Sequence, residues 1–181
     1  IYNKHFVSQS KTKSPRSCMK RPCLTCAQKN KIQKMTNKTE NKMFETVFVT
    51  VGNGQFDPLI KEIDRLKAKG KIKGKVIIQI GYGSFEPKHC EFFKFAPTLH
   101  EYYDKASFVI CHGGPGTVFE ILRRELPVIA LANIDRTDPR HQVEFLEGIS
   151  EETDSLLYCP DVKRLEEFLN MAKGHDFIPY Q

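Results

Sequence analysis

Residues 107–126 read SFVICHGGPGTVFEILRREL and contain an apolar run, a glycine-rich loop and a helical pattern in direct succession. The run FVIC predicts a strand that is buried on both faces. The segment TVFEILRREL (117–126) has apolar residues at helical spacing and predicts a helix. A buried strand that leads directly into a helix is the unit from which parallel α/β sheets are built.

The same alternation extends to both sides of this stretch. Further strands are predicted at 46–51, 75–81, 91–97, 127–132 and 155–159. Further helices are predicted at 59–70, 98–106, 141–148 and 162–174. Thr98 is expected to be the N-cap of its helix. Six strands that alternate with helices predict a doubly wound, Rossmann-like parallel sheet with helices on both faces.

Residues 1–42 differ from the rest of the chain in composition. They hold eleven Lys or Arg residues and one acid, Glu40, so the segment carries +10, while the other 139 residues carry −4. A polar, basic segment without periodicity is typical of a disordered tail. We therefore expect the working domain to comprise residues 43–181 and to begin near Met43. A basic tail also attracts nucleic acid, but the acidic body argues against a nucleic-acid-binding protein.

The six cysteines do not indicate a disulfide framework, because that inference applies to short secreted sequences. Cys18, Cys23 and Cys26, with His5 upstream, have ligand types that zinc uses. Zinc is the weaker interpretation, because a second closely spaced ligand pair is missing. No apolar run approaches the roughly 18 residues of a membrane-spanning helix, so we expect the chain to be soluble by itself.

The loop HGGPGT (112–117) is the first candidate site. Ligands bind outside the carboxyl ends of parallel strands, and the N–H groups of a helix N-terminus suit a diphosphate. Thr117 is expected to cap the helix and to donate to a phosphate, and Glu120, one turn on, could hold ribose hydroxyls. The alternative is a turn that only joins strand to helix, with Glu120 as a solvated first-turn acid.

Other nucleotide-binding motifs are missing. The loop 51–58 lacks the third glycine of the dinucleotide fingerprint. The second strand ends at Gln79 and is not followed by the acidic residue that this fingerprint requires. The sequence contains neither the P-loop pattern nor a D-x-D motif that would hold a metal-bound nucleotide. We therefore expect no NAD and no metal, and a phosphate would be stabilised by backbone N–H groups.

Four features together resemble one known family. They are VFVTVGNGQFDPLI (47–60), IIQIG (77–81), FVICHGGPGT (108–117) followed by Glu120, and the pair His141 and Gln142. Over about residues 46–170 the sequence resembles the C-terminal domain of family 28 glycosyltransferases. Within that family it is similar to the split N-acetylglucosamine transferases of lipid-linked oligosaccharide synthesis and their counterparts in bacterial exopolysaccharide synthesis.

The resemblance implies a UDP-sugar donor and a set of residues that bind it. The diphosphate would lie on the glycine-rich loop and His112, the ribose on Glu120, the uracil near Phe95 to Leu99, and the sugar near the His-Gln pair. The implied donor-binding residues are Phe95, Leu99, His112, Gly113, Gly114, Pro115, Gly116, Thr117, Glu120, His141 and Gln142. Alternatively, the His-Gln pair is an ordinary helix start with Gln142 solvated.

The resemblance also implies that the enzyme is incomplete. The chain would be one half of a GT-B fold, and a membrane-associated partner subunit would bind a polyprenyl-diphosphate-linked acceptor at the cytosolic membrane face. The catalytic base would come from that partner, so no catalytic residue is assigned in this chain. The loop of Gly52, Asn53 and Gly54 would face the partner across the cleft. A non-catalytic enhancer of a partner glycosyltransferase is the alternative.

Overall fold

The structure is a computed structural model that describes residues 42–134 and 139–181. A six-stranded sheet forms its centre, and its strands are β1 (Thr46–Thr50), β2 (Lys75–Gln79), β3 (Glu91–Phe93), β4 (Phe108–His112), β5 (Val128–Leu131) and β6 (Leu157–Cys159). The helices are α2 (Asp57–Ala68), α3 (His100–Lys105), α4 (Pro115–Leu122), α5 (Pro139–Glu152), the 3₁₀ turn η1 (Val162–Arg164) and α6 (Leu165–Ala172).

The strands pair in the order β3-β2-β1-β4-β5-β6, and every pair is parallel. The chain winds from β1 outward to β3, and then returns to the centre and winds from β4 outward to β6. The winding direction therefore changes between β1 and β4. The predicted doubly wound parallel sheet is confirmed, and this change of direction marks where ligands bind in such sheets.

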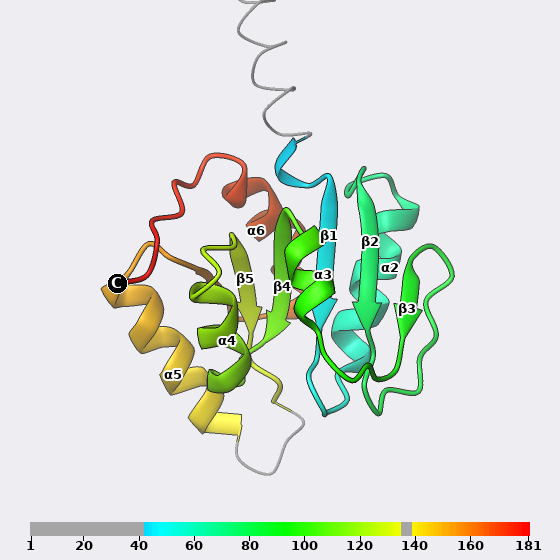
Figure 1. The fold of residues 1–181 in the computed structure, drawn as a ribbon, viewed down its shortest axis with the longest axis horizontal. Helices are drawn as coiled ribbons and strands as arrows, with labels where there is room; N and C mark the ends of the chain where they lie inside the picture. The colour runs from blue at the N-terminus through cyan, green and yellow to red at the C-terminus, as the bar shows by residue number, and fades with distance from the viewer. Residues whose placement is uncertain (1–41, 135–138) are drawn as a thin grey trace, which may run out of the picture.

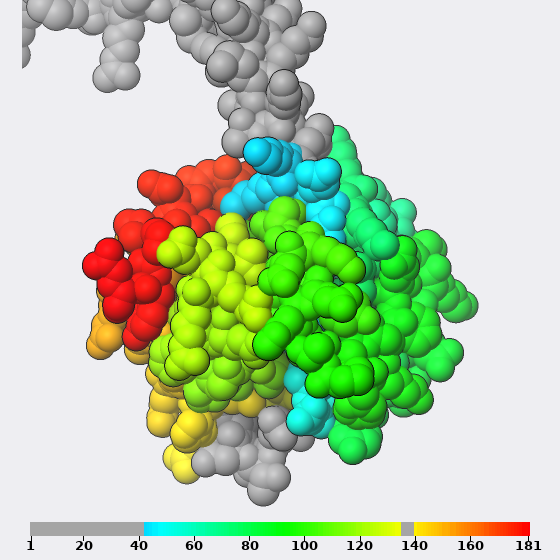
Figure 2. Space-filling model, viewed as in Figure 1, coloured from blue at the N-terminus to red at the C-terminus, as the bar shows by residue number. Residues whose placement is uncertain are grey.

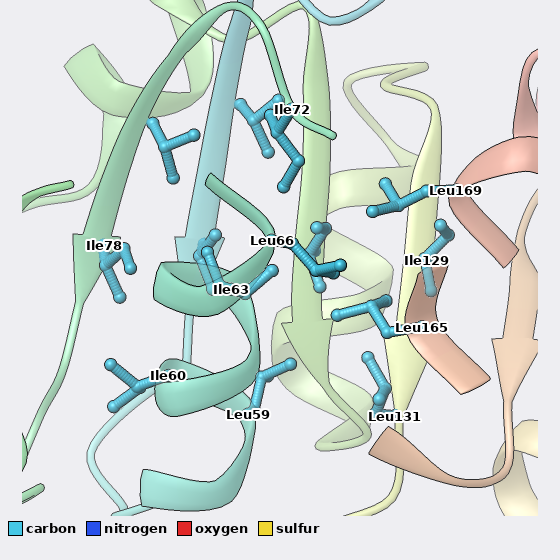
Figure 3. Packing of buried hydrophobic residues seen from close by; sticks show 14 of the residues in the cluster. Leu59, Ile60, Ile63, Leu66, Ile72, Ile78, Ile129, Leu131, Leu165 and Leu169 are labelled. Carbon is cyan, nitrogen blue, oxygen red and sulfur yellow. The ribbon is translucent and has the colours of Figure 1, made fainter. Parts of the chain in front are cut away.

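Helices α2 and α6 cover one face of the sheet (Figure 1). Figure 3 shows the apolar side chains of α2 and α6 pointing toward the strands. Ile63 and Leu66 of α2 and Leu165 of α6 are fully buried in this layer. Burying each such side chain stabilises the fold by about 1.5–3 kcal/mol.

Helices α3 and α4 lie in front of the sheet in Figure 1, on its other face. Phe48 of β1 stacks on Tyr102 at 5.4 Å between ring centroids and meets the edge of Tyr103 at 5.3 Å. Phe93 of β3 stacks on Tyr102 at 4.4 Å. Aromatic contacts of this kind add about 0.5–1.5 kcal/mol beyond the buried area, and they fix α3 above β1.

The boundaries of several elements differ from the prediction. The third strand ends at Phe93 rather than at residue 97, and α4 begins at Pro115, two residues early, because proline suits the first turn of a helix. The last predicted helix starts as a 3₁₀ turn. Thr98 as an N-cap is wrong by one residue: the N-cap is Leu99, although the Thr98 hydroxyl accepts from the His100 N–H at 3.2 Å.

The start of the described chain belongs to the folded domain. Met43 and Phe44 pack against the core, and the Phe44 and Phe108 ring centroids lie 4.7 Å apart. The predicted tail and its Cys18, Cys23 and Cys26 lie outside the described residues, apart from Lys42. Among the helices of residues 42–134 and 139–181, none has the length and apolarity to cross a membrane.

Candidate functional site

A cleft of about 370 Å³ opens at the carboxyl end of the sheet, where the winding direction changes. Figure 2 shows the loop after β1, in cyan, at the lower edge of the molecule beside segments coloured green. The cleft is lined by Gly52, Asn53, Gln79, Ala96, Pro97, Thr98, Leu99, His100, His112, Thr117 and Glu120. The loop after β1, the ends of β2 and β4, the segment 96–100 and helix α4 therefore meet in one cleft.

The side chain of His112 is held between two glycines. A Cβ atom on Gly52 would lie 2.7 Å from His112 Cε1, and one on Gly114 would lie 2.5 Å from His112 Nε2. His112 is only 6% exposed although it lines the cleft. The loops after β1 and β4 can therefore pack this closely only because both positions are glycine.

The N-terminus of α4 points into this region. Gly114 is the N-cap, Pro115 is the first helical residue, and the first helical bond runs from the Val118 N–H to the Gly114 carbonyl at 3.0 Å. Gly116 and Thr117 come before Val118 in the chain, so their N–H groups have no acceptor within the helix. Beside Gly116 the space is open, since a Cβ there would meet no described atom within 4 Å. An anionic ligand can therefore approach these N–H groups.

The prediction that Thr117 caps α4 is wrong, because Thr117 is the third residue of the helix and no side chain caps it. A proline inside the loop motif was the signal for the earlier start. Thr117 nevertheless lines the cleft, and so does Glu120. A hydroxyl, which both donates and accepts, and a carboxylate, which accepts, thus face the same space from one helix.

Glu120 lies in the second turn of α4, so its interpretation as a first-turn acid is wrong. Its carboxylate lies 3.7 Å from His100 Nε2 and 3.7 Å from an Arg124 guanidinium nitrogen. These contacts bring two cationic or ionisable groups to the edge of the cleft. The side chain of Glu120 remains 40% exposed, which leaves its oxygens accessible to a ligand hydroxyl.

Gln79 is a cleft residue that the sequence analysis did not assign to the site. It is 3% exposed, and its Oε1 accepts a hydrogen bond of 2.5 Å from the Thr50 hydroxyl. Thr50 Oγ1 also accepts from the Gly52 N–H at 3.2 Å. A polar residue at the end of an otherwise apolar strand was the available signal, because buried polar groups need a partner or a role.

The His-Gln pair lies away from the cleft lining. Gln142 is 7% exposed, so the interpretation of it as solvated is wrong, and its Oε1 accepts from the Asn133 N–H at 2.9 Å. The Asn133 side chain in turn donates to the Gln55 carbonyl at 2.7 Å. His141 is exposed. Gln142 therefore links α5 to the end of β5 by a hydrogen bond, and Asn133 links the end of β5 to the loop after β1 by another.

Two further predicted positions lie beside the cleft rather than in it. Phe95 is 47% exposed and packs against the exposed ring of Tyr82 at 4.8 Å between centroids. Gly113 faces α5, since a Cβ there would lie 2.6 Å from Leu146 Cδ1. The carbonyl of Gly54 accepts from the Tyr82 N–H at 2.9 Å, which joins the loops after β1 and β2.

A second hollow, of about 620 Å³, lies on the α2 and α6 side of the sheet. Its wall is formed largely by apolar side chains, including Phe56, Leu131 and Val162. It is larger than the cleft, but it lacks the glycine-rich loop and the accessible α4 N-terminus. We assign the ligand site to the smaller cleft, because a few convergent polar groups define a binding site better than volume does.

The remaining ionisable candidates do not face the cleft. Burial acts to raise the pKa of Asp57, but hydrogen bonds from Ser84 and Phe85 outweigh it and the pKa lies below its usual value. Burial raises the pKa of the fully buried Cys111, as expected for an inert thiol. Within residues 42–134 and 139–181, no cluster of three or more His, Cys, Asp or Glu side chains suits a metal ion.

Residues 46–167 match the model of the glycosyltransferase family 28 C-terminal domain. The chain belongs to this family. The match includes the glycine-rich loop, Glu120 and all six strands of the sheet. The resemblance inferred from the motifs is confirmed.

Curated relatives of this family 28 domain include one transferase subunit, ALG13, from different organisms. The human "UDP-N-acetylglucosamine transferase subunit ALG13" is 31% identical over 124 residues, which is 62% of this chain and 11% of that protein. The subunit of the same name from Candida albicans is 28% identical over 80 residues, which is 43% of this chain and 26% of that protein. The chain thus spans about a tenth to a quarter of the length of these relatives.

Solved structures agree with the family 28 fold. The solution structure of ALG13 superposes with a TM-score of 0.54 at 19% identity and covers 75% of this chain and 88% of that one. MurG from Acinetobacter baumannii superposes with a TM-score of 0.52 at 14% identity, over 75% of this chain and 42% of that one. The domain therefore has the fold of one half of a GT-B glycosyltransferase.

Proposed function

We propose that this chain is the donor-binding subunit of a two-component glycosyltransferase and that its donor is a UDP-sugar. The observation that carries the proposal is the meeting of His112, Thr117 and Glu120 with the α4 N-terminus in one cleft at the centre of the sheet. Membership of family 28 supports a nucleotide-sugar site. The names of the ALG13 relatives support UDP as the nucleotide and a hexose-type sugar as the transferred group.

In this proposal the donor diphosphate lies against the N–H groups of Gly116 and Thr117, beside His112. The open space beside Gly116 leaves room for the phosphates. As the bond to the sugar breaks, negative charge grows on UDP, and donors that are already oriented stabilise it. Removing one such donor commonly costs about 2.7–4 kcal/mol in other enzymes. The helix N-terminus supplies a positive field, so we propose that no metal is required.

The nucleoside would occupy the other side of the cleft. The Glu120 carboxylate can accept hydrogen bonds from both ribose hydroxyls, since it has two oxygens and donates none. The segment 96–99 also lines the cleft and would hold the uracil. We keep His141 as a proposed sugar contact and give Gln142 a supporting role, because the Gln142 oxygen already accepts from the Asn133 N–H.

We propose that a membrane-associated partner subunit binds a polyprenyl-diphosphate-linked acceptor and provides the base that deprotonates it. The described residues have the fold of one half of a GT-B enzyme. The curated relatives are named as subunits of a transferase, which supports a second half on a partner chain. The loop of Gly52, Asn53 and Gly54 would face that partner. The complex would then work at the cytosolic membrane face, in polysaccharide or lipid-linked glycan synthesis.

Calorimetric titration of the full chain with UDP and a series of UDP-sugars tests the proposal. We expect saturable binding that Glu120→Ala weakens by tenfold or more. Glu101→Ala is the matched control, because Glu101 is 79% exposed and pairs only with Lys105 among the described residues. If no UDP compound binds, the donor-subunit proposal is wrong and the enhancer alternative is favoured.

A further inference from the structure

Thr50 and Gln79 form a chain of hydrogen bonds beneath the cleft. The two residues lie opposite each other in the β1–β2 pair, and both are almost completely buried. The Gly52 N–H donates to Thr50 Oγ1 at 3.2 Å, and the Thr50 hydroxyl donates to Gln79 Oε1 at 2.5 Å. Gln79 is also part of the cleft lining. The chain therefore runs from the loop after β1 to a side chain at the floor of the cleft.

The direction of these bonds fixes the orientation of the Gln79 amide. The Thr50 hydroxyl has one proton to donate, and its oxygen already accepts a hydrogen bond from the Gly52 N–H. The buried Thr50 proton needs an acceptor, and the Gln79 oxygen is the acceptor that the structure provides. The amide nitrogen, Nε2, is thereby directed away from Thr50. Within the described residues it donates to no protein acceptor, so its two protons are available to a ligand.

We infer that Gln79 donates a hydrogen bond from Nε2 to the diphosphate of the donor, and that Thr50 is the residue that positions it. This inference rests on the proposed function. Gln79 lies next to the Gly52 loop, Gly52 packs on His112, and His112 leads into the α4 N-terminus. The amide is thus on the diphosphate side of the cleft. A neutral donor to a charged oxygen forms one of the stronger hydrogen bonds in proteins.

Two substitutions of Gln79 test the donor role in the full chain. Gln79→Met keeps the length of the side chain and removes its donor, and we expect UDP affinity to fall about tenfold or more. Gln79→Glu keeps an acceptor for Thr50 but places a negative charge beside the phosphates, and we expect a larger loss. Binding of uridine, followed by ligand-observed NMR, should change by less than about twofold in Gln79→Met, because uridine has no diphosphate.

Thr50→Val and Thr50→Ser form a matched pair for the positioning role. Valine has the shape of threonine without the hydroxyl, and we expect a severalfold loss of UDP affinity with uridine binding retained. Serine restores the hydroxyl and should restore UDP affinity to within about twofold. Thermal unfolding of each variant separates a loss of binding from a loss of folding.

The results separate this inference from the proposed function. If Gln79→Met and Thr50→Val bind UDP as the unsubstituted chain does, while Glu120→Ala loses it, the inference is wrong and the proposed function stands. If Gln79→Met weakens uridine as much as UDP, the amide serves the nucleoside and the assignment to the diphosphate is wrong. If the unsubstituted chain binds no UDP, both the inference about Gln79 and the proposed function are wrong.

Discussion

Gly52 packs directly on the ring of His112: a Cβ atom on Gly52 would lie 2.7 Å from His112 Cε1, and the φ of Gly52 is +62°. Both the space and the backbone conformation therefore require glycine at this position. The contact joins the end of β1 to the end of β4, which is where the winding of the sheet reverses. It is also the centre of the proposed donor site.

Gly52→Ala should destabilise the protein by about 1–3 kcal/mol, the usual cost of a left-handed conformation at a non-glycine residue. It should also weaken UDP binding, because His112 must move. Urea unfolding and calorimetric titration measure the two effects. Gly148→Ala in α5 is the control: a Cβ there meets no described atom within 4 Å, and alanine should raise helix stability by about 0.5–1 kcal/mol. Equal stability of the two variants would contradict this account of Gly52.

Substitutions at His141 and Gln142 should have different consequences. Gln142→Ala leaves the buried Asn133 N–H without its acceptor and should cost about 1–3 kcal/mol of stability. His141→Ala, at an exposed position, should change stability by less than about 0.5 kcal/mol while lowering the affinity for UDP-sugar more than that for UDP. Unfolding curves and competitive titration measure these effects. A fully stable Gln142→Ala variant would show that the Asn133 bond is unimportant.

Asp64 should make stability depend on pH in acid. Burial acts to raise its pKa, but hydrogen bonds from the His89 N–H, the His89 side chain and the Lys88 N–H outweigh it, so the folded pKa lies below the ordinary value. A lowered folded pKa contributes stability that is fully present above the unfolded pKa of about 3.9 and is lost as pH falls through the folded pKa.

We therefore expect Asp64→Asn to be less stable than the unsubstituted protein by about 1–2 kcal/mol at pH 5, with the difference shrinking below pH 4. Chemical unfolding at several pH values between 5 and 3 measures this trend. Asp154→Asn, at an exposed position, is the control and should behave as the unsubstituted protein does. A difference that stays constant over this range would rule out the Asp64 charge as its cause.

Removing residues 1–42 should leave the folded domain intact, because the shortened chain keeps Met43 and Phe44, which pack against the core. The chain 43–181 should unfold within a few degrees of the full chain. The chain 46–181 loses the contact of Phe44 with Phe108 and should be less stable by about 1–3 kcal/mol. Thermal unfolding of the three chains is the measurement, and an unfolded 43–181 would refute the proposed domain boundary.

The sequence predicted the elements well where apolar periodicity is strong and local. The runs that became β1, β2 and β4 and the stripe of α2 were recognisable, because each buries one face or both faces along its own length. Boundaries were less accurate at Pro115 and Thr98, where the choice of N-cap depends on how the chain enters the helix. The loop motif itself located His112, Thr117 and Glu120, all of which line the cleft.

By itself, the sequence determined the strand and helix alternation, the glycine-rich loop and hence the parallel sheet, because these follow from residues that are neighbours along the chain. Only the tertiary structure decided that Gln79 lies in the cleft and that Gln142 is buried against Asn133. It also decided that His112 sits between Gly52 and Gly114. The physical reason is that each of these relationships joins separate segments, and hydrogen bonds and close packing between such segments exist only once the sheet has brought them together.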